Sequence, residues 1–87
     1  MEEDENFYEC ISFVRASKHR AAIMRYLKYD VRTPTEIGVE LDIRTNHISN
    51  LLAELRNQGL VVCITPNIHK GRLYQLTDKG KRIVEHI

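Results

Sequence analysis

The chain has 87 residues, with 13 lysines and arginines against 12 acids, a formal net charge of +1 and a hydrophobic content of 43%. This length predicts one domain, residues 1–87, with a modest core and little room for a separate catalytic pocket. No apolar run approaches the roughly 20 residues of a membrane span, and the acidic start does not fit a signal peptide. We therefore expect a cytoplasmic protein with no membrane partner.

Charge is unevenly distributed along the chain. Residues 1–9 hold five acids and no base, so the rest carries 13 bases against seven acids, a net charge of +6. A basic body behind an acidic start is compatible with phosphate binding, although a near-neutral protein with acids at a helix start explains it equally well. We expect residues 1–6 to form a mobile acidic tail.

Two helices are predicted before residue 30. The first covers about residues 5–15, where Phe7, Cys10, Ile11 and Val14 recur at helical spacing. The second covers about 18–29, with Ser17 as N-cap and an apolar set of Ile23, Met24 and Leu27. The two stripes are out of phase, which predicts a break near Ser17. Arg20 falls on the apolar side, where local pairing is expected rather than contact with nucleic acid.

A helix-turn-helix is predicted next. Thr33-Pro34-Thr35-Glu36 combines a capping box with a proline at the first helical position, so a short helix is expected over about 34–41. Within it, Gly38 permits close approach of another helix. After a tight turn, a longer helix is predicted over about 45–58, capped by Thr45 and ended by Gly59. Two short helices joined in this way form a helix-turn-helix.

The longer helix has two contrasting faces. Its inner face carries Ile48, Leu51, Leu52 and Leu55. Its outer face carries Asn46, Asn50, Ala53 and Asn57, flanked by His47 and Ser49. Asparagine side chains read base edges, and a small alanine lets a helix approach a groove closely. An ordinary surface helix would carry glutamate and lysine instead, so this face predicts a recognition helix.

A hairpin and a last helix complete the predicted order. Strands are expected over 60–65 and 72–76, joined by a turn over 66–71. The tip of the hairpin is polar and basic, with Asn67, His69, Lys70 and Arg72. Thr77 is expected to cap a final helix that carries Ile83, Val84 and Ile87 on one side.

Five short segments resemble small prokaryotic, particularly archaeal, winged-helix regulators of the MarR/ArsR type. They are residues 17–20, 33–37, 47–55, 59–61 and 71–80, within a resemblance that covers about 11–87. The resemblance implies an α+β, mostly helical fold. This fold is a winged helix-turn-helix with an extra N-terminal helix, a two-stranded wing and a C-terminal helix.

The resemblance also implies a dimeric transcription factor on double-stranded DNA, with the helix from Thr45 in the major groove and the wing, 66–72, on backbone or minor groove. By matching positions, the base-reading residues are Thr45, Asn46, Ser49 and Asn50. The backbone and wing contacts are assigned to Arg44, Arg56, Asn67, His69, Lys70 and Arg72.

Dimerisation is also expected because one recognition helix reads too few base pairs for useful specificity. The expected homodimer interface consists of Phe7, Ile11, Val14, Ile83, Val84 and Ile87. The alternative is that both apolar stripes cover the core of one monomer. A second hypothesis makes the chain a winged-helix protein-protein interaction module without direct DNA binding, with the stripe over 7–14 as its exposed contact surface.

Other chemistry is poorly represented in the sequence. Cys10 and Cys63 lie in apolar patterns and are expected to pack as small hydrophobes. The four histidines lack metal-ligand spacing, and there is no glycine-rich phosphate loop. Metal-sensing proteins of the ArsR type carry cysteine clusters that this chain lacks. We expect no enzyme, no metal and no cofactor, and the sequence identifies no small-molecule effector.

Overall fold

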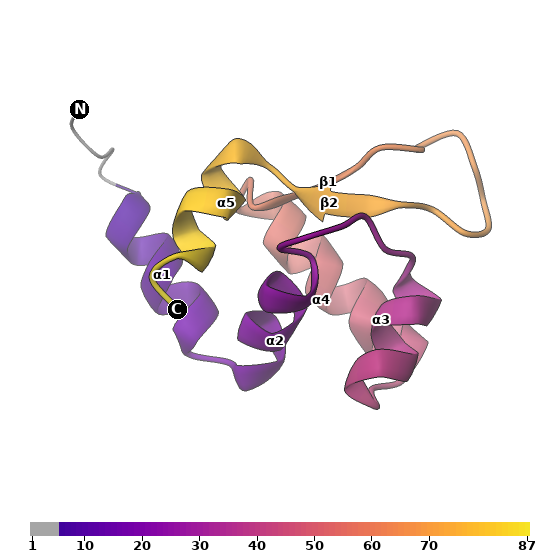
Figure 1. The fold of residues 1–87 in the computed structure, drawn as a ribbon, viewed down its shortest axis with the longest axis horizontal. Coiled ribbons are helices and arrows are strands. Elements are labelled where there is room, and N and C mark those ends of the chain that lie inside the picture. The colour runs from indigo at the N-terminus through magenta and orange to yellow at the C-terminus, as the bar shows by residue number, and fades with distance from the viewer. Residues whose placement is uncertain (1–5) are drawn as a thin grey trace.

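The computed structural model describes residues 6–87, so the predicted acidic tail lies outside the described residues except for Asn6. The elements follow in the order α1 (Phe7–Arg15), α2 (Lys18–Tyr26), α3 (Pro34–Leu41), α4 (Thr45–Asn57), β1 (Val61–Cys63), β2 (Tyr74–Leu76) and α5 (Asp78–Val84). Figure 1 shows the helices grouped together, with the loop between β1 and β2 projecting from the group. This is the predicted winged helix-turn-helix with an extra N-terminal helix.

One apolar cluster joins all of these elements. It contains residues from α1 to α5 and from both strands. The inner face of α4 lies within it, and Ile48, Leu52 and Leu55 are each at most 1% exposed. The predicted separation of the two faces of this helix is therefore confirmed.

The residues predicted for a dimer interface require a correction. Phe7, Ile11, Val14, Ile83 and Val84 are each at most 9% exposed, and Ile87 is half-buried. Helix α1 packs against α2 and α5, so each apolar stripe is covered by the other helices of the same chain. The alternative interpretation, in which both stripes cover the core of one monomer, is the one that the structure shows. The same burial removes the exposed surface that was predicted for a protein-interaction module.

The junction of α1 and α2 follows the sequence prediction. Ser17 has an extended backbone, and its hydroxyl accepts a hydrogen bond from the Arg20 N–H at 3.2 Å. Helix α2 ends at Tyr26, earlier than predicted, because the chain tightens there and Lys28 N–H donates to the Arg25 carbonyl.

Arg20 is paired locally, as predicted. Its guanidinium donates to the Phe13 carbonyl at 2.8 Å and to the Glu54 carboxylate at 3.2 Å. It also lies 3.8 Å above the centre of the Phe13 ring. Arg20 therefore joins α1, α2 and α4.

The helix-turn-helix corner is fixed by backbone contacts. The capping box of Thr33 and Glu36 is present at both of its hydrogen bonds. Asp42 ends α3 in the left-handed conformation (φ 58°), and Ile43 N–H donates to the Gly38 carbonyl at 2.9 Å. A Cβ atom at Gly38 would lie 2.7 Å from the Ile43 carbonyl oxygen. The tightest approach is therefore to the turn itself, and the side chains of Thr45 and Ile48 on α4 lie within 4 Å of the same position, as the predicted close approach of another helix requires.

The two ends of α4 differ in how well they were predicted. The N-cap is Arg44 rather than Thr45, because the Arg44 carbonyl already accepts from Ile48 N–H at 3.0 Å. Thr45 is therefore the first residue inside the helix. At the other end, Gly59 adopts φ 75° and Leu60 N–H donates to the Leu55 carbonyl at 3.0 Å. This is the glycine-ended helix terminus that the sequence predicted.

The wing strands are shorter than the predicted runs. Their antiparallel register pairs Val61 with Leu76 and Cys63 with Tyr74. Beyond Cys63 the ladder weakens, since Leu73 N–H donates to the Thr65 hydroxyl (2.9 Å) instead of to a backbone carbonyl. On the other edge, Tyr74 and Arg32 exchange two backbone hydrogen bonds of 2.9 and 3.0 Å. The connector before α3 is thereby tied to the base of the wing.

Candidate nucleic-acid interface

The outer face of α4 is an exposed surface of short polar side chains. Thr45, Asn46, Ser49 and Asn50 are all exposed, as are His47 and Asn57. They are held outward because the opposite face of the helix is buried in the core. A fixed helix with small polar groups on its free side can place hydrogen-bond donors and acceptors against base edges.

The two central asparagines differ in their hydrogen bonding. The Asn46 side-chain oxygen accepts from the backbone N–H of His47 at 3.0 Å. Within residues 6–87, the Asn50 side chain makes no hydrogen bond. Asn50 therefore presents both an amide donor and an acceptor, which is the pair needed for bidentate contact with adenine.

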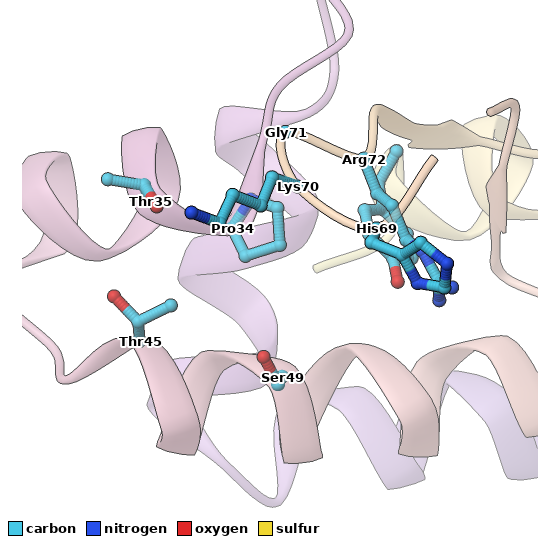
Figure 2. Close-up of a pocket in the computed structure, with 9 residues that line it drawn as sticks. Pro34, Thr35, Thr45, Ser49, His69, Lys70, Gly71 and Arg72 are labelled. Atoms are coloured by element: carbon cyan, nitrogen blue, oxygen red, sulfur yellow. The ribbon is translucent and has the colours of Figure 1, made fainter. Parts of the chain in front are cut away.

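A groove of about 480 Å³ opens beside the first half of α4. Pro34 and Thr35 line it from the start of α3, and Thr45 and Ser49 line it from α4. The wing contributes His69, Lys70 and Arg72. Figure 2 shows Thr45 and Ser49 rising from α4 toward the segments that carry the other lining residues. Among residues 6–87 no aspartate or glutamate lines the groove, so its charged groups are all basic.

The wing loop is braced by a contact within itself. The Arg72 side chain donates through Nε to the Ile68 carbonyl at 2.6 Å, which braces the loop internally. Lys70 forms no ion pair within residues 6–87, so its ammonium group is available to a phosphate.

Comparisons with known proteins support the fold. No protein-family model matches the chain, and no curated protein matches it. Among solved structures, HlyU from Vibrio cholerae superposes with a TM-score of 0.80 at 23% identity, over 99% of this chain and 92% of HlyU. The MarR family transcription regulator SP03579 gives 0.69 at 28% identity, over 77% of this chain and 46% of that protein. A mutant of ZitR from Lactococcus lactis superposes with a TM-score of 0.71 at 22% identity, over 80% of this chain and 49% of ZitR.

The chain has the fold of winged-helix transcription regulators. It spans about half the length of ZitR and of SP03579 and most of the length of HlyU. The similarity is to regulators rather than enzymes, in agreement with the sequence prediction. The organisms of these structures give no support to the archaeal part of the resemblance.

The winged helix brings together only part of the predicted site. Of those residues, the groove collects Thr45, Ser49, His69, Lys70 and Arg72. Asn46 and Asn50 lie on the exposed face of α4 outside the groove lining. Arg44 lines another hollow, with Gly38, Val39, Asp42, Ile43 and Thr45. Arg56 lies in the last turn of α4, and Asn67 lies in an exposed turn of the wing.

Four residues that line the groove were not predicted as site residues. They are Pro34, Thr35, Gly71 and Tyr74. The signal for the first two was present, because the first helix of a helix-turn-helix lies near the DNA backbone and the Thr33-Pro34-Thr35 motif marks its start. Tyr74 is brought there by its pairing with Arg32, which the sequence did not show.

The remaining candidate chemistry is structural. Cys10 is buried and Cys63 is half-buried in β1, and both are free thiols. In the part of the chain that is described, no three potential metal ligands lie close enough to share an ion. Over the same residues, no helix has the length and apolar character to cross a membrane.

Proposed function

We propose that the chain is a sequence-specific regulator of transcription that binds double-stranded DNA. The observation that carries this proposal is the exposed, short and uncharged polar face of α4 beside a groove whose charged residues are all basic. In this arrangement α4 (Thr45–Asn57), the helix predicted over about 45–58, enters the major groove, and the wing, 66–72, follows the backbone or an adjacent minor groove.

Base reading is assigned to Thr45, Asn46, Ser49 and Asn50. Asn50 has a free amide and is the main candidate for bidentate contact with adenine. Asn46 must first release its bond to the His47 N–H before its oxygen can accept from a base. The hydroxyls of Thr45 and Ser49 lie closer to the wing and suit contacts at the edge of the same site.

Backbone contact is assigned to basic and polar groups around this face. Lys70, Arg72 and His69 line the groove. Arg44, Arg56 and Asn67 are exposed at the two ends of α4 and in the wing. Phosphate contacts of this kind fix the register of the protein on the duplex but carry no sequence information.

We further propose a homodimer, a single domain over 1–87 and a cytoplasmic location. Two recognition helices are needed to read two half-sites about one helical turn apart. The buried stripes cannot supply the interface, so it must use exposed residues, for which Tyr8 on α1, 68% exposed, is a candidate. Light scattering at micromolar concentration tests this, and a mass of one chain would remove the dimer.

The binding surface is tested by an amide NMR titration of the isotope-labelled protein with a short duplex at low salt. The proposal expects shifts concentrated at residues 44–50 and 67–72. Unchanged amide chemical shifts in both segments, or changes confined to the chain ends, would overturn it. Sequence specificity is then tested by comparing the affinity for a selected duplex with that for its scrambled sequence, where equal affinities would refute base reading.

A further inference from the structure

A second cavity lies between α1, α2 and the segment after α5. Its volume is about 380 Å³, and it is lined by Arg15, Lys18, Ala21, Arg25, His86 and Ile87. Three of these side chains are permanently cationic at neutral pH and a fourth is a histidine, while among residues 6–87 no aspartate or glutamate side chain contributes to the lining. Such a concentration of like charge around one hollow is unfavourable unless solvent or an anion compensates it.

The bases of this cavity differ from the other bases that flank α2. Arg20 pairs with Glu54 at 3.2 Å, and Lys28 pairs with Glu85 at 3.8 Å. By contrast, Arg15, Lys18 and Arg25 form no ion pair within residues 6–87. Since Glu54 and Glu85 show that acids are available around the same helix, the lack of one beside the cavity is a local property of this surface.

The basic cavity is separate from the groove proposed for DNA. None of its lining residues comes from α3, α4 or the wing. Figure 1 shows the C-terminal end beside α1 and α2, whereas the loop of the wing projects on the other side of the molecule. A DNA duplex seated on α4 and the wing therefore does not account for these charges.

The first turn of α2 connects the basic cavity to α4. Lys18 lines the cavity, and the next residue, His19, packs its ring edge-on against His47 of α4 with 5.5 Å between ring centres. The following residue, Arg20, forms the ion pair with Glu54 of α4. Three consecutive residues in the first turn of α2 thus touch the cavity and two points along the proposed recognition helix.

We propose that the basic cavity binds a small polyanion, a phosphate or polycarboxylate compound, and that the first turn of α2 transmits its occupancy to α4. Two guanidinium groups and an ammonium group around one hollow match the geometry of multivalent oxyanions, which accept several charge-assisted hydrogen bonds at once. Binding itself is independent of DNA binding; only the consequence for α4 rests on the proposed function.

The test uses the full chain without DNA, so that failure of the DNA proposal cannot affect it. Labelled protein is titrated with pyrophosphate and, separately, with citrate, with sodium chloride adjusted to constant ionic strength. Saturable amide shifts are expected at Arg15, Lys18, Arg25 and His86 and, through the first turn of α2, at His47 and Glu54. If only pyrophosphate binds, the site is for phosphates; if citrate binds as well, it accepts polycarboxylates.

Matched variants make the assignment specific. The double variant Lys18→Gln, Arg25→Gln should weaken pyrophosphate binding about tenfold or more, since it removes two charge-assisted contacts. The control Lys79→Gln, Lys81→Gln removes the same charge from α5 and should leave the affinity within about twofold, because these bases lie outside the cavity.

Three results would overturn the proposal. Equal losses of pyrophosphate affinity in the two double variants would show that the ligand is attracted only by the net charge of the protein. Amide shifts that are reproduced by sodium chloride alone would show a general ionic-strength effect, and shifts that concentrate at Lys70 and Arg72 would show binding in the DNA groove. Saturable shifts confined to the cavity, with His47 and Glu54 unmoved, would overturn the link to α4.

Discussion

The helix-turn-helix corner and the wing face the same groove, yet they are built differently. At the corner, Ile37 and Ile48 are fully buried and the turn is fixed by the contact between Gly38 and Ile43. In the wing loop, Ile64 and Ile68 are 42% and 47% exposed, and the loop is held by the Thr65 hydroxyl and the internal bond of Arg72. One region is anchored in the core, and the other is held at its surface.

This difference matches what the two regions are proposed to do. Base edges are read through directional hydrogen bonds, which require that α4 keep its position to within fractions of an ångström. Phosphates attract a basic loop through charge, which tolerates small displacements because the Coulomb energy changes slowly with distance. The corner therefore has to be rigid, whereas the wing needs chiefly to be basic and close.

The largest expected effect comes from the same substitution made in the two regions. Ile48→Ala removes a fully buried side chain from α4 and should reduce the free energy of unfolding by about 2–5 kcal/mol. Ile64→Ala in the wing, where the side chain is 42% exposed, should cost about 1 kcal/mol or less. Urea unfolding followed by circular dichroism measures both. Equal losses would contradict the contrast between an anchored corner and a surface-held wing.

Gly38→Ala tests the turn of the corner directly. The added Cβ would lie 2.7 Å from the Ile43 carbonyl oxygen, a backbone atom that cannot move without opening the turn. Overpacking of this kind costs about 1–3 kcal/mol, against a gain of roughly 1 kcal/mol in helix propensity. A net loss of stability is expected by thermal melting, together with weaker DNA binding.

The neighbouring residue provides the control for that change. Val39 is 79% exposed on the same helix, so Val39→Ala should alter stability by less than about 0.5 kcal/mol. A Gly38→Ala protein as stable as the parent would show that the turn can relax and that the corner is less rigid than its contacts indicate.

Asn50→Ala tests whether α4 reads the base sequence of DNA. It should cost about 1–3 kcal/mol in affinity for a selected duplex and much less for a scrambled one, with stability unchanged because the side chain is exposed. Asn57→Ala makes the same chemical change at the last residue of the helix and should have little effect on either duplex. Fluorescence anisotropy measures all four affinities, and equal losses on both duplexes would remove Asn50 from base reading.

The smallest expected effect is that of Lys70→Ala in the wing. Losing one phosphate contact should weaken binding to selected and scrambled duplexes alike and should reduce the slope of log affinity against log salt by about 0.9. The measurement is a salt series by anisotropy. A loss seen on the selected duplex alone would mean that the wing reads sequence, against the division of roles between the two regions.

Much of the fold could be predicted because its signals are local. Ser17, Thr33 and Thr77 cap helices through their own hydroxyls, as their sequence context indicated. The end of α4 at Gly59 needs a positive φ, which glycine adopts without strain. The error of one residue at the start of α4 arises because Arg44 begins the helix through its backbone carbonyl, without a side-chain cap, so side-chain preferences give no signal for it.

By itself, the sequence determined the order of the elements, the caps and the division of α4 into a buried and a polar face, since each depends on residues within a few positions of one another. Tertiary packing decided that the stripe of α1 faces α2 and α5 rather than a second copy, because an apolar stripe does not specify what covers it. Packing also brought Pro34 and Tyr74 to the groove and gathered Arg15, Lys18, Arg25 and His86 around one cavity. Such convergence of distant residues depends on how helices pack in three dimensions, which no local spacing records.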